Sequence, residues 1–257
     1  MSLLRSRVAY LTLNRAEASW SYGQSKLSFP LAFDNNNLDF SELRSSLLKQ
    51  TKLGSGRKVI VNLNSGWVRF LILPWQAHLF SEQDWLALAK NQFKTVYGNH
   101  AASWEVKLAY QGYGHPVIAT AIDQYLCNGC DEMAEALGWK LDVMQPSFVD
   151  ISNRYCNPSR GNSWLLMIEQ DLILLFEANN GIWQKVNIAS IPDGQTHKTI
   201  LRLVQQVSIQ RAETASKTKI YVFDSAGAEY RDLLSDLGMD IQMLRPDWQV
   251  ISQRAAL

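Results

Sequence analysis

The chain has 257 residues, of which 25 are Lys or Arg and 24 are Asp or Glu, so its formal net charge is +1. This balance excludes a large sequence-independent phosphate-binding surface, because such a surface needs an excess of basic side chains. A hydrophobic fraction of 47% excludes a disordered chain, and three cysteines indicate a reducing compartment in preference to a disulfide scaffold.

The first residues lack the pattern of a secretory signal, because no apolar stretch follows the basic Arg5 and Arg7. The best candidate for a membrane span, residues 164–183, is interrupted by polar residues that include Glu169 and Asp171. We therefore expect a soluble intracellular protein with no membrane span of its own.

Periodic apolar patterns predict the elements of the first part of the chain. A hairpin turns at residues 14–16, a helix begins near its expected N-cap Ser41, and a second hairpin turns at Asn64. Ser81 and Asp84 have the spacing of a capping box and predict the start of a strong helix. In chain order, these and the following strands and helix are expected over residues 8–20, 40–50, 58–73, 81–97, 103–110, 116–122, 124–137 and 140–143.

The pattern then restarts in the last part of the chain. A three-stranded meander is followed by alternating helices and strands, over residues 163–169, 172–178, 182–186, 195–212, 219–223, 226–237 and 240–244. Strands come first and alternating units follow in both the first and the last third. This order predicts an α/β protein with an internal duplication of element order.

Short signatures along nearly the whole chain resemble one family. The segment Arg69–Pro74 precedes a helix that opens with residues 81–85, and the segment from Val117 to Asp123 precedes a helix and the sequence 137–141. Residues 164–183 and 220–243 complete the series. Together they are similar to the actin-like ATPase-fold proteins of pilus and secretion assembly, PilM and the cytoplasmic domain of GspL.

The resemblance implies an actin-like (ribonuclease H-like) α/β fold with two duplicated βββαβα halves and a small inserted α/β subdomain. Residues 1–73 plus 147–257 would form the actin-like core, and residues 74–146 would form the insert. Two halves would then face each other across a cleft.

Actin-like ATPases hold the phosphates with two turns that carry Asp and Gly, and place a Gly-rich turn under the adenosine, because bare amides must reach the phosphate oxygens. In this chain the first turn, residues 13–16, has neither Gly nor Asp, and the second, residues 168–171, has acids but no Gly. The third turn, residues 224–228, keeps small side chains. Residues that would surround a nucleotide, only if binding is retained, are Asn14, Arg15, Asp224, Ser225 and Gly227.

The remaining motifs do not indicate a catalytic or metal-binding site. Cys127 and Cys130 have C-x-x-C spacing, but no second Cys or His pair lies near them in sequence, so we interpret them as buried structural thiols. The four histidines lack metal-ligand spacing, and the sequence contains neither a phosphate-binding P-loop nor a nucleophile elbow. Glu169 and Asp171 are expected to be solvated. No metal site and no catalytic residue are predicted.

The nine tryptophans form an unusually large set. Trp85, Trp139 and Trp164 fit buried faces of their elements. Five others lie near predicted strand ends or turns, where they would be partly exposed, and these are Trp20, Trp67, Trp75, Trp104 and Trp183. Because Trp is enriched at protein interfaces, the set favours a partner-binding surface.

Three functions are compatible with these sequence features. The leading hypothesis is a non-catalytic cytoplasmic scaffold of a type IV pilus or type II secretion-like assembly, held at the inner membrane through its partners. It would need no cofactor, would not bind nucleic acid, could form a homodimer, and would capture the cytoplasmic tail of a membrane-anchored partner as an extended peptide. The alternative is a working ATPase or ATP-dependent switch with ATP and Mg²⁺ as cofactors. A ribonuclease H-like nuclease is set aside, because the predicted strands carry very few acids.

Overall fold

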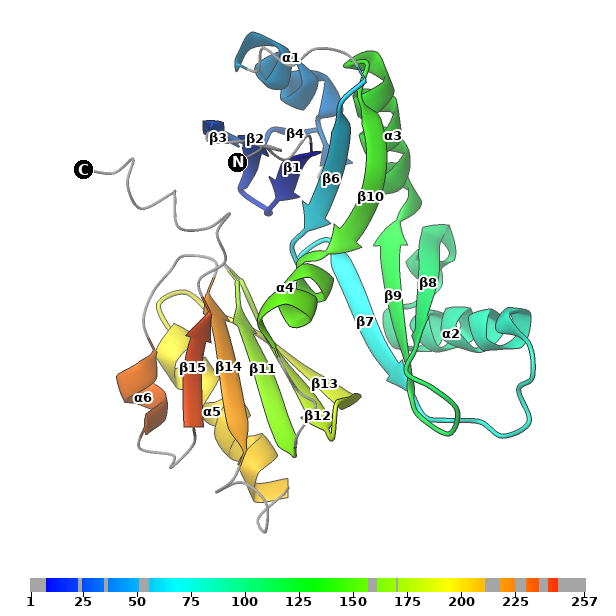
Figure 1. Ribbon diagram of the computed structural model, residues 1–257, viewed down its shortest axis with the longest axis vertical. Helices are drawn as coiled ribbons and strands as arrows, with labels where there is room; N and C mark the ends of the chain where they lie inside the picture. The colour runs from blue at the N-terminus through cyan, green and yellow to red at the C-terminus, as the bar shows by residue number, and fades with distance from the viewer. Residues whose placement is uncertain are drawn as a thin grey trace, which may run out of the picture. The chain divides into compact units, whose positions relative to one another are not determined.

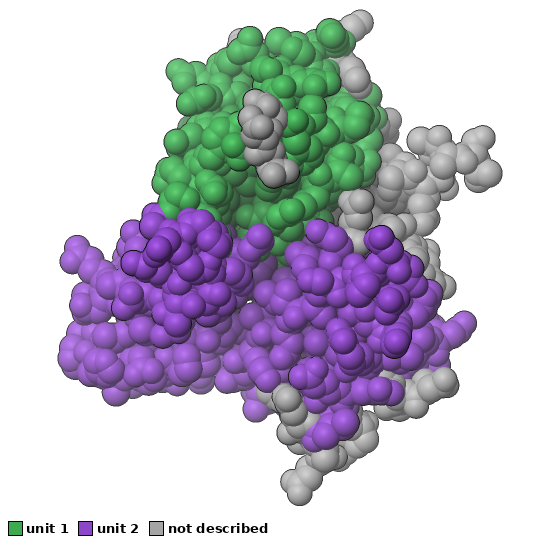
Figure 2. Space-filling model, turned by 180° about the vertical axis from the view of Figure 1, so that it is seen from behind, with its two compact units in different colours: residues 1–68, 103–105, 122–150 green, residues 69–102, 106–121, 151–257 purple. Residues whose placement is uncertain are grey.

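The computed structural model describes residues 8–22, 25–34, 37–50, 56–156, 161–169, 171–210, 218–224, 230–235 and 240–244. The chain divides into two compact units, coloured separately in Figure 2. The first unit comprises residues 1–68, 103–105 and 122–150, and the second comprises residues 69–102, 106–121 and 151–257.

The first unit is built on a five-stranded sheet with the order β10-β6-β1-β2-β3 (Figure 1). Its strands are β1 (Val8–Leu13), β2 (Glu17–Tyr22), β3 (Ser25–Pro30), β6 (Lys58–Leu63) and β10 (Lys140–Pro146). β1, β2 and β3 form an antiparallel meander, whereas β6 pairs in parallel with both β1 and β10. The last three residues of β1 are all buried, as expected for a central strand that is covered on both faces.

Two helices of the first unit, α1 (Phe40–Gln50) and α3 (Gln124–Ala136), contact each other. A Cβ atom at Gly129 would overlap the ring of Phe40, so the glycine permits this close approach. Asp39 is the N-cap of α1, because its carboxylate accepts hydrogen bonds from the backbone amides of Ser41 (2.9 Å) and Glu42 (3.2 Å). The sequence prediction of Ser41 as the cap was wrong by two residues.

The second unit contains a five-stranded sheet with the order β13-β12-β11-β14-β15. Its strands are β11 (Asn162–Ile168), β12 (Leu172–Asn179), β13 (Ile182–Ser190), β14 (Lys219–Asp224) and β15 (Asp240–Leu244). β11, β12 and β13 are antiparallel, and β14 pairs in parallel with both β11 and β15. The arrangement therefore repeats that of the first sheet strand for strand, which confirms the predicted α/β class and the duplicated order.

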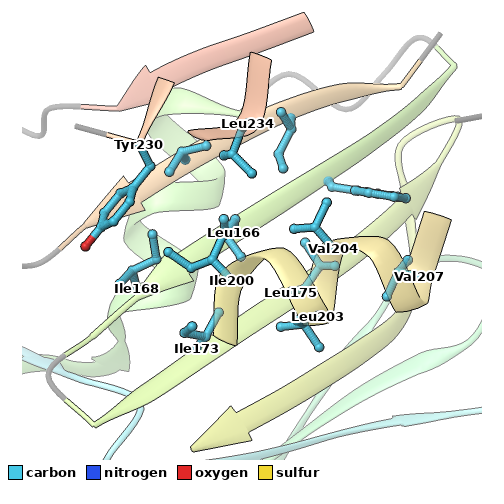
Figure 3. Packing of buried hydrophobic residues seen from close by; sticks show 13 residues of the cluster. Leu166, Ile168, Ile173, Leu175, Ile200, Leu203, Val204, Val207, Tyr230 and Leu234 are labelled. Atoms are coloured by element: carbon cyan, nitrogen blue, oxygen red, sulfur yellow. The ribbon is translucent and has the colours of Figure 1, made fainter. Parts of the chain in front are cut away.

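One face of this second sheet is covered by α5 (Thr196–Gln210) and the short α6 (Arg231–Ser235). Figure 3 shows Ile200 and Val204 of α5 among side chains of the strands, including Leu166 and Leu175. All four are at most 1% exposed. Apolar residues two apart on the strands meet apolar residues three or four apart on the helix, which is the pattern that predicted both elements.

A smaller three-stranded sheet has the order β7-β9-β8, from β7 (Val68–Leu73), β9 (Val117–Asp123) and β8 (Trp104–Tyr110). Helix α2 (Glu82–Tyr97) lies between β7 and β8 in the chain, and a 3₁₀ turn, η1 (Asn99–Ser103), follows it. The predicted capping box is confirmed: the amide of Asp84 donates to the Ser81 hydroxyl at 3.1 Å, and the amide of Ser81 donates to the Asp84 carboxylate at 3.2 Å.

Two features of the fold differ from the sequence predictions. β6 and β7 belong to different sheets and form no hairpin, because β6 is flanked by β1 and β10 and has no free edge. Strand β3, helix α4 (Ser147–Tyr155) and the short antiparallel pair β4 (Phe33–Asp34) and β5 (Asn37–Leu38) were not predicted. The predicted domain boundaries, with an insert over residues 74–146, stay a prediction.

Candidate functional site

The turn between β1 and β2 is the position where the resemblance places a phosphate-binding turn. The backbone amide of Asn14 donates to the carbonyl of Glu17 at 2.9 Å and closes the turn. Because β1 and β6 are parallel, the residue after β6 lies at the same edge of the sheet, and the amide of Asn64 donates to the carbonyl of Leu13 at 3.0 Å. A backbone hydrogen bond thus joins two turns that are about 50 residues apart in the chain.

The side chain of Arg15 lies across this pair of turns. Its Nη2 and Nε atoms donate to the carbonyl oxygen of Gly66 at 3.0 and 3.3 Å. The guanidinium carbon lies 5.7 Å from the ring centroid of Trp67, within the range of a cation–π contact. A Cβ atom at Gly66 would lie 2.7 Å from Cγ of Arg15, so the glycine leaves room for the arginine stem.

The side chains of Asn64 and Trp67 complete the hydrogen bonding. Asn64 accepts from the amide of Gly66 at 2.7 Å and donates through Nδ2 to Oδ1 of Asn14 at 3.4 Å. The indole nitrogen of Trp67 donates to the carbonyl of Asn14 at 3.1 Å. The amides of Asn14, Asn64 and Gly66 all donate to acceptors within the protein, so these three are not directed at a ligand.

The equivalent turn of the second sheet lies between β11 and β12. The amide of Glu169 donates to the carbonyl of Leu172 at 2.9 Å, which repeats the bond from Asn14 to Glu17 in the first turn. Glu169 is only 3% exposed, so the expectation that it is solvated was wrong, whereas Asp171 is exposed as expected. The acidic side chain faces inward because the tight backbone bond places it at the end of a buried strand.

Asp224 ends β14, opposite Ile168 in the parallel register. Its side chain is 4% exposed, and together with Glu169 it forms a pair of buried acids at neighbouring strand ends. The pKa of Tyr230 is raised, first by burial and then by the negative charge of Asp224. Of the other residues predicted around a nucleotide, Ser225 and Gly227 lie outside the described residues.

The predicted nucleotide residues therefore fall into two groups. Asn14 and Arg15 belong to the first unit and contact Asn64, Gly66 and Trp67, while Asp224 belongs to the second unit. Within the described part of the chain, no three His, Cys, Asp or Glu side chains gather as a metal site would require.

The sequence did not predict that the β6–β7 connection contacts Asn14 and Arg15, because Asn64 was interpreted as the turn of a hairpin. A usable signal was present. Two β-rich runs separated by a helix, residues 8–13 and 58–63, indicate parallel pairing, and parallel strands place their following turns at the same edge. With that pairing, the segment from Asn64 to Trp67 is expected beside Arg15.

The C-x-x-C pair lies on α3 and faces inward. Cys127 is 4% exposed and Cys130 is fully buried, which confirms their interpretation as buried thiols. Burial, with a further contribution from Glu105, raises the pKa of Cys127 to about 12, and burial also raises the pKa of Cys130. Both groups are therefore protonated at neutral pH, and a protonated thiol is a poor nucleophile and a poor metal ligand.

The tryptophans fall into two groups that only partly match the prediction. Trp85, Trp139 and Trp164 are buried, as predicted. Trp67, Trp75 and Trp104 are half-buried, which confirms that they are partly accessible. Trp20 and Trp183 were expected to be partly exposed but are buried, at 2% and 8% exposure. Trp20 stacks on Trp139 with ring centroids 4.7 Å apart, and the ring centroids of Trp183 and Phe176 are 6.1 Å apart.

The duplicated strand order and the paired turns define an actin-like fold. Neither a family model nor a curated protein matches this sequence. Among solved structures, a chain of the PilM–PilN type IV pilus biogenesis complex matches with a TM-score of 0.62 at 12% identity, covering 94% of this chain and 89% of that chain.

Two further solved structures are similar to this chain in fold. A Bacteroides thetaiotaomicron protein of unknown function with an actin-like ATPase fold matches with a TM-score of 0.58 at 12% identity, covering 92% of this chain and 90% of its own. The cytoplasmic domain of EpsL, an inner membrane component of the type II secretion system of Vibrio cholerae, matches with a TM-score of 0.50 at 12% identity, covering 97% and 94%. The chain thus has the actin-like ATPase fold, as the resemblance to PilM and GspL implied.

None of the described helices has the length and apolar character needed to cross a membrane.

Proposed function

We propose that the chain is a non-catalytic actin-like scaffold in the cytoplasm, part of a type IV pilus or type II secretion-like assembly. It binds the cytoplasmic tail of an inner-membrane partner and is held at the membrane through that partner. The similarity in fold to a chain of the PilM–PilN complex and to the cytoplasmic domain of EpsL supports this proposal.

The proposal that the chain is non-catalytic rests on the hydrogen bonds of the turn that contains Arg15. A phosphate-binding turn presents bare amides to the ligand. Here the amides of Asn14 and Gly66 donate to the protein itself, and the guanidinium donates to the carbonyl of Gly66 at 3.0 Å. A nucleotide would have to break these bonds and displace the arginine from Trp67, so we expect no tight binding of ATP.

The mode of partner binding that fits this fold is the addition of an extended peptide to a sheet edge. β13 is the longest described strand, with nine residues, and it lies at one edge of the second sheet. Ile188 on this strand is 43% exposed. Beyond Trp183, whose amide and carbonyl pair with the side chain of Gln111, a peptide could add to this edge strand, and the exposed apolar side chains of the strand offer contacts that select the peptide.

A comparison of two exposed isoleucines tests this proposal. Affinity-tagged chains carrying Ile188→Glu or Ile209→Glu are expressed in the source cell, cross-linked, and recovered from detergent-solubilised inner membranes. Ile209 on α5 is 77% exposed and serves as the matched control. We expect the wild type and Ile209→Glu to recover the same assembly protein, and Ile188→Glu to recover much less of it. Recovery of no inner-membrane assembly component by the wild type would overturn the proposal.

A further inference from the structure

The small sheet of the second unit carries a group of exposed aromatic side chains that the proposed function does not use. Tyr113, in the connection between β8 and β9, is 89% exposed, and Phe80, in the connection between β7 and α2, is 90% exposed. Tyr110 at the end of β8 is 48% exposed, and Trp75 is half-buried. Exposed apolar patches on a folded domain mark interaction sites.

The two connections that carry these rings lie at the same end of the small sheet (Figure 1). The ring centroids of Trp75 and Tyr113 are 5.0 Å apart in an edge-to-face arrangement. Trp75 also contacts the buried Trp85 of α2, with ring centroids 5.6 Å apart, so packing against the helix holds its ring in place. We call Trp75, Phe80, Glu82, Tyr110 and Tyr113 the aromatic patch.

Local bonds hold the two connections in place. The amide of Leu79 donates to the carbonyl of Gln76 at 3.2 Å, which forms a turn between Trp75 and Phe80. Tyr113 is flanked by Gly112 and Gly114, whose φ values of 113° and 78° belong to the left-handed region that glycine adopts without strain. Gly112 and Gly114 thus permit the tight bend that presents the ring of Tyr113 to solvent.

The charge of the aromatic patch is negative. Residues 74–84 and 108–116 contain two carboxylates, Glu82 and Asp84, two histidines and no Lys or Arg. The charge of Glu82 reaches the hydroxyl of Tyr110, whose pKa is raised first by desolvation and then by this carboxylate. The two carboxylates also offset the positive end of the α2 dipole, which by itself would repel a cation.

Aromatic faces beside carboxylates are the chemistry that recognises cationic side chains. The negative face of an aromatic ring attracts a guanidinium or ammonium group, and a neighbouring carboxylate adds a charge-assisted hydrogen bond. In inner-membrane proteins, the cytoplasmic residues next to a membrane-spanning helix are enriched in Lys and Arg. We propose that the aromatic patch binds an Arg- or Lys-bearing segment of the partner's cytoplasmic tail, an inference that rests on the proposed function.

The aromatic patch adjoins the sheet edge to which the extended part of the tail would add. Gln111 follows Tyr110 in the chain. Its side chain donates a hydrogen bond to the carbonyl of Trp183, the second residue of β13, and accepts one from the amide of the same residue. An extended peptide on β13 would therefore reach the aromatic patch at the start of that strand. This continuity assigns the basic side chains to one end of the bound segment.

The test uses the full chain and a fluorescein-labelled peptide in which Arg alternates with Ser, with fluorescence anisotropy as the readout. Tyr113→Ala, Phe80→Ala and Glu82→Gln are each expected to weaken binding by about two- to five-fold, and the triple variant by about tenfold or more. Tyr113→Phe keeps the ring and is expected to keep the affinity. Ile209→Ala, at an exposed apolar residue outside the aromatic patch, is the matched control and is expected to bind like the wild type.

Control peptides distinguish recognition of a cationic side chain from non-specific apolar binding. A peptide with Leu in place of Arg and one with Glu in place of Arg are expected to bind at least about tenfold more weakly. Equal binding of the Leu peptide, or unchanged affinity in the triple variant, would overturn the inference. If the Arg peptide fails while the wild type still recovers an inner-membrane assembly protein, the inference falls and the proposed function stands.

Discussion

The side-chain amide of Gln111 pairs with the backbone of Trp183 as a neighbouring strand would. Its Nε2 atom donates to the carbonyl of Trp183 at 2.8 Å, and the amide of Trp183 donates to its Oε1 atom at 2.7 Å. Nε2 also donates to the carbonyl of Pro116 at 3.0 Å, so one side chain joins the β8–β9 connection to the start of β13.

Loss of this side chain should loosen the second unit. Gln111→Ala leaves the half-buried amide and carbonyl of Trp183 without these partners, and we expect the free energy of unfolding to fall by about 1–3 kcal/mol. Urea unfolding followed by tryptophan fluorescence measures the change. Gln111→Glu keeps the acceptor and loses the donor, so we expect an intermediate loss near neutral pH. An unchanged urea midpoint for Gln111→Ala would show that the pairing contributes nothing.

The contact between Arg15 and Gly66 should appear as coupling between two substitutions. Arg15→Ala removes the guanidinium bonds and the contact with Trp67, at a cost of about 0.5–2 kcal/mol. Gly66→Ala places a Cβ atom 2.7 Å from Cγ of Arg15 and forces the arginine away. In the Arg15→Ala background, the added methyl group no longer clashes with the aliphatic part of the arginine side chain.

We therefore expect the double variant to lose less stability than the sum of the single variants, by about 0.5 kcal/mol or more in a double-mutant cycle. Thermal or urea unfolding of the four proteins gives the coupling energy. Strict additivity would mean that Arg15 does not occupy the space beside Gly66 in solution.

The close approach of α1 and α3 should be sensitive to one methyl group. Gly129→Ala places a Cβ atom that overlaps the ring atoms of Phe40, and we expect the free energy of unfolding to fall by about 1–3 kcal/mol from overpacking. Phe40→Leu is smaller at that position and should recover part of the loss when combined with Gly129→Ala. A more stable Gly129→Ala protein, as alanine's helix propensity alone would predict, would contradict the observed contact.

The buried thiols should give the stability a dependence on alkaline pH. Burial raises the pKa of Cys127 from 9.0 to about 12, partial burial raises that of the half-buried Cys156 to about 12, and burial also raises the pKa of Cys130. Above pH 9 the unfolded chain loses thiol protons that the folded chain keeps, so these groups contribute less stability as the pH rises from about 9 toward 12.

The triple Cys→Ala variant tests this linkage. We expect its urea midpoint to depend less on pH between 8 and 10 than that of the wild type, because it has no thiol protons to lose. In the native wild-type protein at neutral pH, we also expect Cys127 and Cys130 to react with iodoacetamide far more slowly than in urea. Identical pH profiles of the two proteins would indicate that the thiols are not desolvated in the folded state.

Local signals made much of the fold predictable from the sequence. The alternation in residues 8–13 and the helical spacing of Ile200, Val204 and Val207 identified their elements, because burial of one face imposes those periods. The capping box of Ser81 and Asp84 was also found, since both partners lie within four residues of each other.

Features that depend on distant segments could not be read in the same way. The pairing of β6 with β1 is a contact between residues 50 apart, and a short turn-like sequence at Asn64 resembled a hairpin more than a crossover. Burial of Trp183 arises from Phe176 and Glu169 is buried at a strand end, and neither environment is visible in the flanking residues.

Isothermal titration calorimetry with ATP and Mg²⁺ most directly tests the proposal that this chain does not bind nucleotide. We predict no saturable heat for the wild type, because the turn amides of Asn14 and Gly66 are already bonded and Arg15 lies across them. Saturable binding with a micromolar Kd, abolished by Asp224→Ala, would contradict this claim and establish an ATP-binding protein instead.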